Sequence, residues 1–212
     1  MSNTEDQRIR STSLWALMLV AITFGLVVCV AFMFLFVHPV PPLDAATAER
    51  MKLSEDNLEA MVGHPAPEFR GGEWIAGGKP DVAGKPYLLF FWATWCSACD
   101  RYQDDLNELA ANGAIVIGMH PGGTEASDVQ IAIEEMQLSY PTFLSTDASG
   151  PSAPVSGYPV ALFPYSIVVD ANGFVVERGE GLKESKKKLL ELMQQSSASK
   201  KRSNSDGHST TE

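Results

Sequence analysis

The sequence predicts an α/β domain with a central sheet flanked by helices, preceded by one transmembrane helix. Two short apolar runs, residues 87–92 and 114–119, are typical of buried strands. A stretch with apolar residues at helical spacing follows each run, and this alternation predicts parallel strands joined by a right-handed crossover. The third observation is an uncharged stretch of 24 residues from Leu14 to Val37, which predicts the membrane span.

Composition excludes several classes of protein. An apolar content of 45% over 212 residues is enough to build a core, which argues against wholesale disorder. The net charge of −10 argues against a nucleic-acid partner, because binding phosphates requires a basic face. Three cysteines are too few for a fold held together by disulfides, so their positions matter more than their number.

Residues 13–37 are predicted to be an uncleaved signal anchor. At about 1.5 Å per residue the uncharged stretch extends about 36 Å as a helix, enough to cross a hydrocarbon core of about 30 Å. A cleaved signal peptide is the main alternative, but its apolar region is about 7–15 residues long and a small-residue cleavage site follows closely. The first such triplet here, Ala46-Thr47-Ala48, lies well beyond the stretch.

The basic residues around the span predict its orientation. Arg8 and Arg10 lie just before it, whereas Arg50 is the first basic residue after it. The positive-inside rule therefore places the N-terminus in the cytoplasm and the rest of the chain on the periplasmic side of the cytoplasmic (inner) membrane. We expect a single-pass protein that contacts the lipid bilayer through residues 13–37.

The chain then divides into five segments. A proline-rich spacer opens the linker, and a polar stretch from Ala45 to Met61 is expected to be helical. The residues after Gln194 include many small and charged ones and no large apolar group, which predicts disorder. The predicted segments are a cytoplasmic tail (1–12), the anchor (13–37), an extracytoplasmic linker (38–58), a folded domain (59–194) and a disordered tail (195–212).

A Cys-x-x-Cys pair follows the first predicted strand and opens an amphipathic helix. Cys96 and Cys99 precede Tyr102, Leu106 and Leu109, which fall at helical spacing. Unpaired N–H groups and the dipole at a helix N-terminus stabilise a thiolate on the first cysteine, which can attack a substrate disulfide. The second cysteine then resolves the mixed disulfide. Cys96 is therefore the predicted nucleophile and Cys99 the predicted resolving thiol.

Two other uses of the pair are a zinc half-site and a purely structural disulfide. Zinc requires two further ligands. Cys29 and the four histidines supply no second pair at ligand spacing, so we expect no metal. Cys29 itself is expected to be a small apolar residue within the membrane span.

The segment from Phe91 to Cys99, Phe-Trp-Ala-Thr-Trp-Cys-Ser-Ala-Cys, resembles the active-site segment of the thioredoxin superfamily. More narrowly, it is similar to that of the membrane-anchored TlpA/ResA/CcmG-like thiol–disulfide oxidoreductases. Two further motifs agree, Gly63-His64-Pro65-Ala66-Pro67-Glu68-Phe69 and Gly84-Lys85-Pro86. The resemblance covers roughly residues 60–194 and implies a thioredoxin-like fold, a central mixed sheet flanked by helices, with an N-terminal hairpin and a central insertion.

The family also has a cis-proline opposite the cysteines, and Pro141 and Pro164 compete for this position. A segment rich in proline and serine follows Pro141, whereas two apolar runs around the turn Asn172-Gly173 follow Pro164 and predict a hairpin. Pro141 then belongs to the inserted segment. The resemblance implies that Pro164 is cis, that the backbone of Phe163 pairs with the substrate, and that Trp95 frames the reactive thiol.

Two positions depart from the family's pattern. Relatives often carry a buried acid six residues before the first cysteine or a glutamate three residues after the second, where this chain has Phe90 and Tyr102. The redox potential is therefore not carried over from relatives. His120, at the C-terminal end of the second predicted strand, is either an exposed loop residue or a proton shuttle or substrate contact at the edge of the sheet that carries the active site.

The resemblance implies an enzyme, a membrane-tethered extracytoplasmic thiol–disulfide oxidoreductase of the protein-disulfide reductase type. Relatives reduce disulfides in apocytochromes c before haem attachment or in copper-site proteins. Such a reductase requires a protein disulfide as substrate and a transmembrane thiol donor of electrons. It requires no cofactor beyond the redox-active disulfide of Cys96 and Cys99.

Two other activities occur on the same fold and are kept as alternatives. A peroxiredoxin-like peroxidase needs Pro and Thr at the positions of Leu89 and Ala93. A copper-chaperone-like protein uses a cysteine pair with one more intervening residue than Cys96 and Cys99 have. A redox-inert binding module is a third possibility, and the intact Cys-x-x-Cys argues against it.

Overall fold

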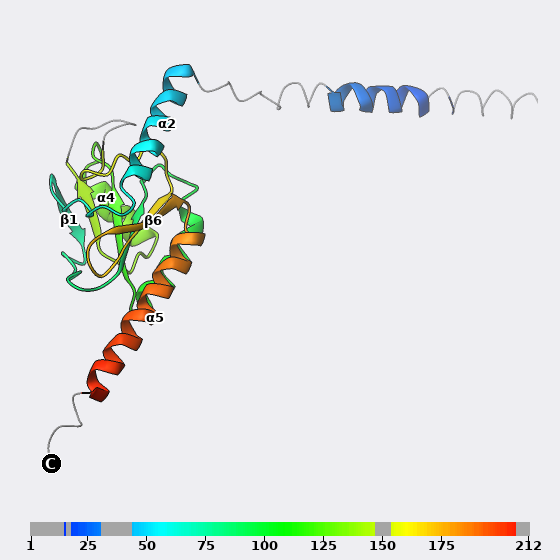
Figure 1. Cartoon of the computed structure of the whole chain (residues 1–212). Coiled ribbons are helices and arrows are strands. Elements are labelled where there is room, and N and C mark those ends of the chain that lie inside the picture. Colours follow the sequence, from blue (N-terminus) through cyan, green and yellow to red (C-terminus); the bar gives the residue numbers. More distant parts are fainter. Residues whose placement is uncertain (1–14, 16–17, 31–43, 147–153, 207–212) are drawn as a thin grey trace, which may run out of the picture. The chain divides into compact units, whose positions relative to one another are not determined.

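The two buried runs become neighbouring strands at the centre of a mixed sheet. The structure, a computed structural model, describes residues 15, 18–30, 44–146 and 154–206 (Figure 1). Strands β2 (Tyr87–Phe91) and β3 (Ile115–His120) pair in parallel. Every residue of β2 is buried, which explains why its sequence is continuously apolar rather than alternating.

Six strands form one sheet in the order β1-β4-β3-β2-β5-β6. Beside β3 runs the parallel strand β4 (Thr142–Ser145), whereas β1 (Gly72–Ala76), β5 (Tyr165–Val169) and β6 (Val175–Glu180) are antiparallel to their neighbours. The β5–β6 hairpin turns at Gly173, whose φ of 85° is a conformation that favours glycine. The predicted mixed sheet and closing hairpin are therefore confirmed.

The predicted N-terminal hairpin does not form among the described residues. Strand β1 pairs instead with β4 in the inserted segment, with Trp74 opposite Phe143. The connection from β1 to β2 begins with Gly77 and Gly78, both at positive φ, and continues to Pro80, which cannot donate to a ladder. This connection turns the chain without supplying a second strand, so the partner of β1 comes from a distant segment.

Alternate residues of β2 face two different cores because successive side chains of a strand point to opposite faces. Leu88 and Phe90 face the first core, which α3 (Gln103–Ala111), α4 (Ala126–Glu135) and α5 (Lys183–Asp206) cover. Leu89 and Phe91 face the second core, which includes Leu58 of α2 (Ala45–Ala60). The sheet is thus covered on both faces, and this packing fixes the C-terminal ends of β2 and β3, from which the next loops begin.

Helix α2 coincides with the stretch predicted to be helical, but it is more than a linker. The predicted domain boundary at residue 59 falls inside this helix, and the compact unit begins at Ala45. Leu58 is 1% exposed and belongs to the second core. Burial of this side chain attaches the helix to the domain, which the polar composition of residues 45–57 does not reveal.

Helix α5 continues past Gln194 to Asp206 (Figure 1). The hydroxyls of Ser196 and Ser197 donate to the carbonyl oxygens of Leu192 and Met193, 2.9 and 2.8 Å away. Residues 195–206 of the predicted disordered tail are therefore helical in the structure, and residues 207–212 lie outside the described part. The serine hydroxyls hydrogen-bond back to the preceding turn of this helix, and residues 195–206 add no large apolar side chain to it.

Among the described residues of the N-terminal unit, residues 18–30 are helical, and their large apolar side chains, such as Met18 and Phe24, are exposed. Within the described part of the chain, no helix is both long and apolar enough to cross a membrane. The other residues of the predicted anchor, apart from Trp15, and the cytoplasmic tail lie outside the described residues. The anchor therefore stays a prediction.

Candidate active site

The active-site segment is a series of tight turns that joins β2 to α3. The N–H of Cys96 donates to the carbonyl oxygen of Ala93, that of Cys99 to Cys96, and that of Tyr102 to Cys99, at 2.9 to 3.1 Å. A short 3-10 helix (Asp100–Tyr102) precedes α3, which begins at Gln103. The cysteines thus lie one turn before the α-helix and not in its first turn as predicted. The helix dipole acts mainly within the first turn, so its effect on Cys96 is smaller than expected.

Cys96 and Cys99 are joined in a disulfide with their Cα atoms 5.4 Å apart. Cys96 is 7% exposed and Cys99 is 1% exposed. The first cysteine residue is therefore the more exposed of the two, which is the order that a nucleophile and a resolving thiol require. No group of three or more His, Cys, Asp or Glu residues in the described part of the chain is arranged to hold a metal ion.

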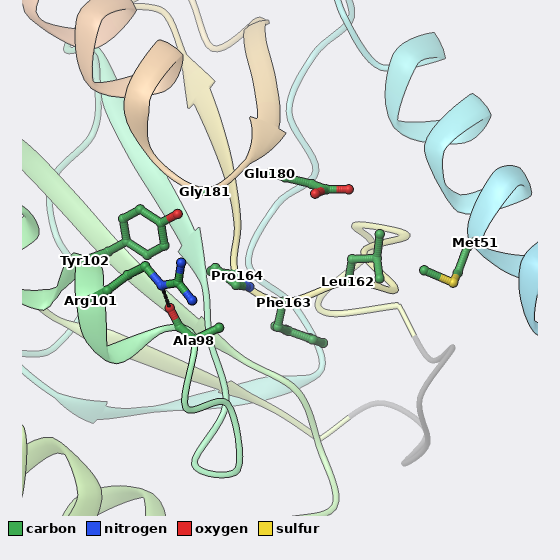
Figure 2. A pocket seen from close by; sticks show the side chains of 9 residues that line it. All are labelled: Met51, Ala98, Arg101, Tyr102, Leu162, Phe163, Pro164, Glu180 and Gly181. Atoms are coloured by element: carbon green, nitrogen blue, oxygen red, sulfur yellow. Dashed lines mark hydrogen bonds between the residues drawn. The ribbon is translucent and has the colours of Figure 1, made fainter. Parts of the chain in front are cut away.

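The residues predicted to contact substrate gather beside the disulfide. The Phe163–Pro164 peptide bond is cis, as the sequence predicted. Trp95 is 66% exposed, and its ring meets that of Phe163 edge to face with centroids 5.5 Å apart. Phe163 and Pro164 line a pocket of about 480 Å³ together with Ala98, which lies between the two cysteines (Figure 2).

His120 is hydrogen-bonded to the backbone of the active-site turn. Its side chain is fully buried, and its Nε2 accepts a hydrogen bond from the backbone N–H of Thr94 at 3.1 Å. Because Nε2 accepts, Nδ1 carries the proton and donates to the carbonyl oxygen of Pro121 at 2.7 Å. Burial lowers the pKa of His120, which keeps the ring neutral in this role. The expectation of an exposed loop residue or substrate contact is therefore wrong.

Trp92 and Trp95 have opposite environments although they are three residues apart. Trp92 is fully buried, and its ring meets His120 edge to face with centroids 5.1 Å apart. It is thus a packing residue that fixes the histidine ring, while the exposed Trp95 is available to a substrate.

Gln103 and Tyr140 form a buried polar pair beside Cys99 that the sequence did not predict. Gln103 Nε2 donates to the carbonyl oxygen of Cys99 at 3.4 Å, and the hydroxyl of Tyr140 donates to Gln103 Oε1. Burial raises the pKa of the Tyr140 hydroxyl, so it stays a donor. One signal for this pair was available in the sequence. Gln103 lies three residues before Leu106, on the helical face that the apolar spacing predicts to be buried.

The two positions where relatives often carry an acid are aromatic here. The rings of Phe90 and Tyr102 pack against each other with centroids 5.9 Å apart. The guanidinium of Arg101 lies 5.9 Å from the Tyr102 ring, and its Nε donates to the carbonyl oxygen of Ala98 at 3.0 Å. Neither of these two positions therefore supplies a carboxylate to Cys99, and the buried polar side chains beside its carbonyl oxygen are the uncharged Gln103 and Tyr140.

A buried strand that leads into a Cys-x-x-Cys disulfide beside a cis-proline loop defines a thioredoxin-like thiol–disulfide oxidoreductase. Comparison with protein families agrees. Residues 62–178 match the AhpC/TSA family, and the chain belongs to this family.

Similar proteins carry out thiol–disulfide exchange by name. The chain is 36% identical over 135 residues to the thiol:disulfide interchange protein DsbE of Escherichia coli K12, covering 59% of this chain and 69% of DsbE. It is 29% identical over 138 residues to the thiol-disulfide oxidoreductase ResA of Bacillus cereus, covering 61% of this chain and 76% of ResA. The crystal structure of a thiol-disulfide isomerase from Corynebacterium glutamicum shares the fold, with a TM-score of 0.53 at 17% identity over 60% of this chain and 95% of that chain.

Proposed function

We propose that this chain is a membrane-tethered, extracytoplasmic protein-disulfide reductase that works through Cys96 and Cys99. The observation that carries the proposal is the unequal exposure of the two cysteine residues, 7% for Cys96 and 1% for Cys99, beside a cis-proline loop. The similarity to DsbE and ResA supports the same chemistry.

The proposed reaction transfers two electrons from the dithiol to the substrate. The Cys96 thiolate attacks one sulfur of a substrate disulfide, forms a mixed disulfide and releases the other sulfur as a thiolate. Cys99 loses its proton and attacks Cys96 Sγ, which closes the internal disulfide and releases the second substrate sulfur. Both released thiolates take up protons from water. A dithiol donor then reduces the Cys96–Cys99 pair by the same two steps in reverse.

The backbone beside Pro164 is proposed to bind the substrate as an extended segment. The rings of Phe163 and Trp95 meet edge to face, and together they form an apolar edge next to Cys96. The substrate class is a protein disulfide, such as that of an apocytochrome c before haem attachment or of a copper-site protein. Cys96 and Cys99 suffice for the exchange, so no metal or organic cofactor takes part.

The membrane tether is proposed to be residues 13–37. The exposed apolar side chains of residues 18–30 support this, because an exposed apolar helix lacks a core to bury in. Arg8 and Arg10 before the span, by the positive-inside rule, support a location of the catalytic domain on the periplasmic side of the membrane. A reductase in that location needs electrons from the cytoplasm, and the proposed donor is a transmembrane thiol protein.

Two other activities on this fold lack their residues here. A peroxidase of the peroxiredoxin type needs a hydroxyl at position 93, where the structure has Ala93, 1% exposed. A copper chaperone needs a wider cysteine spacing than the pair that closes as Cys96–Cys99. Thiol–disulfide exchange is the activity that the residues present can perform.

The test is the reduction potential of the full-length chain, measured by equilibration in thiol buffers and alkylation of free cysteines. A value at or below about −200 mV supports a reductase, whereas a value near about −120 mV, typical of strong oxidants, would reverse the proposed direction. In parallel, Cys99→Ser should accumulate a mixed disulfide with substrate through Cys96. Absence of that species with a good substrate under non-reducing conditions would contradict the assigned roles.

A further inference from the structure

Helix α2 presents one inward stripe to the domain. Its four partly or fully buried residues recur at intervals of four, three and four, and all other residues of the helix are exposed; they are Thr47, Met51, Ser54 and Leu58. This spacing is that of one face of an α-helix. Leu58 lies in the second core, so the C-terminal end of the stripe is anchored by apolar burial.

Ion pairs and a buried hydroxyl fix the middle of α2. The guanidinium of Arg178 in β6 pairs with both Glu55 and Glu59, which lie one turn apart on the helix, and donates to the Tyr165 hydroxyl at 2.9 Å. A side chain only 15% exposed that holds two carboxylates in fork geometry gives a directional clamp.

Ser54 ties the same helix to the segment that leads into the cis-proline loop. Its hydroxyl donates to the carbonyl oxygen of Pro159 and accepts from the N–H of Ala161 at 3.2 Å. Ala161 is two residues before Phe163. The position of α2 and the position of the substrate-binding loop are therefore set by one set of contacts.

Met51, one turn before Ser54, reaches the active-site pocket. Figure 2 shows its side chain pointing from α2 toward Leu162, with Phe163 and Pro164 behind it. Ala98 and Tyr102 form the opposite wall of the same pocket. Met51, Leu162 and Phe163 are all half-buried, so one side of the pocket is apolar and partly open. Met51 on this side comes from helix α2.

We propose that Met51 is a specificity-determining residue, and that the apolar wall of Met51, Leu162 and Phe163 receives an apolar side chain adjacent to the reactive cysteine of the substrate. The inference rests on the proposed reductase function and names its substrate class. The occupant is a protein segment, because the wall continues directly from the cis-proline loop, whose Phe163 packs against the core cluster that contains Cys96 and Cys99. A methionine side chain is flexible and polarisable, so it adapts to apolar side chains of different shape.

The experiment measures kcat/KM of the full-length chain, purified in detergent and kept reduced by dithiothreitol. Two ten-residue peptides carry one cysteine as a mixed disulfide with glutathione, flanked on both sides by Leu in one and by Ser in the other. Each turnover converts the mixed disulfide to peptide thiol and glutathione, and dithiothreitol supplies the two electrons. Bis(2-hydroxyethyl) disulfide, too small to reach Met51, reports the chemistry alone.

We expect the unmodified chain to prefer the Leu peptide and Met51→Ala to lose about tenfold in kcat/KM for it, because a lost apolar contact of this size weakens binding by that order. The Ser peptide and the small disulfide should be turned over at unchanged rates. Met51→Leu should retain the preference. The matched control is Leu53→Ala, on the exposed side of the same helix, which should change nothing.

Two results would overturn the inference and leave the reductase function intact. The unmodified chain could use both peptides equally well, or Met51→Ala could lose activity equally on all three substrates.

A different result would overturn the proposed function itself, namely that the unmodified chain fails to reduce even the small disulfide. Met51→Gln keeps the side-chain length in case the alanine variant unfolds, and it should lower the Leu-to-Ser preference; an unaltered preference in a folded Gln variant would contradict the role of Met51.

Discussion

The two ends of the active-site turn are supported by different chemistry. On the Cys96 side, the N–H of Thr94 donates to His120, an ionisable side chain whose pKa burial lowers from its ordinary value. On the Cys99 side, the carbonyl oxygen accepts from Gln103, which Tyr140 holds in turn, and neither side chain changes charge near neutral pH. The support beside Cys96 therefore contains an ionisable group, whereas the support beside Cys99 does not. Two cysteines in one turn need not share an environment.

The largest expected effect separates the two sulfurs themselves. Cys96→Ser should abolish turnover of a disulfide substrate, a loss of at least about 10³-fold, because it removes the nucleophile. Cys99→Ser should still react once. Single-turnover assays with the full-length chain measure both. If Cys96→Ser retained activity while Cys99→Ser lost its first reaction, the roles of the two ends would have to be exchanged.

The support under Cys99 should be the larger contributor to stability. Gln103→Ala leaves the Tyr140 hydroxyl without its partner in a buried site and removes one of the two hydrogen bonds to the Cys99 carbonyl oxygen, which still accepts from the N–H of Tyr102. The free energy of unfolding should fall by about 1–3 kcal/mol. Urea unfolding of the oxidised chain measures this. Gln130→Ala, which removes an exposed glutamine bonded to Glu134, is the control and should cost less than about 0.5 kcal/mol.

The double variant Gln103→Leu with Tyr140→Phe sharpens this result. It removes donor and acceptor together and should restore most of the stability, since only an unpaired buried group carries the full cost. Additive losses in the double variant would mean that the pair acts through packing and not through its hydrogen bond.

The support under Cys96 should respond to pH. Burial lowers the pKa of His120 from its ordinary value of 6.5, so the unfolded chain takes up a proton at this site more readily than the folded one. Its contribution to stability is therefore fully present above pH 6.5 and is lost as the pH falls toward the lower folded value. A protonated ring would also direct a proton at the N–H of Thr94.

Urea midpoints between pH 8 and pH 5 test this, with His120→Gln compared against the unmodified chain. The glutamine variant should show a shallower decline in acid, whereas His64→Gln, which changes an exposed histidine, should follow the unmodified chain. If the urea midpoints of His120→Gln and the unmodified chain fell equally as the pH is lowered, the titration of His120 would not contribute to the loss of stability in acid.

The smallest effect is expected for an ion pair on the exposed surface of α3, the helix that also carries Gln103. Lys186 of α5 pairs with Asp105 of α3 at 2.7 Å, on partly exposed surface. Lys186→Gln should change the free energy of unfolding by less than about 1 kcal/mol, and added salt should shrink the difference. A loss as large as that of Gln103→Ala would show that burial is not what distinguishes these contacts.

The residues with short-range signals were predictable from the sequence. The apolar run of β2, the Cys-x-x-Cys turn and the Asn172-Gly173 hairpin each follow from neighbouring residues, and the hairpin in turn identified Pro164 as the cis-proline. The start of α3 was placed one turn early because the 3-10 turns at the cysteines leave the helical spacing of Leu106 and Leu109 unchanged.

The features that were missed depend on distant or backbone partners. The stripe of α2 contains only two apolar residues, Met51 and Leu58, so its period is too weak to predict packing. His120 is buried because two backbone groups, at Thr94 and Pro121, satisfy it, and no sequence pattern displays such groups. The partner of β1 is about 70 residues away in the chain, beyond any local pattern.

Strand β1 has a consequence for self-association. It forms one edge of the sheet, where unpaired N–H and C=O groups could recruit a strand from another molecule. Its five residues are few, it begins at Gly72 against the ring of Phe143, and its register shifts between Trp74 and Ala76. A short and irregular edge is a poor template for a foreign strand. This end of the sheet therefore resists the edge-to-edge stacking that leads from a folded sheet to aggregates.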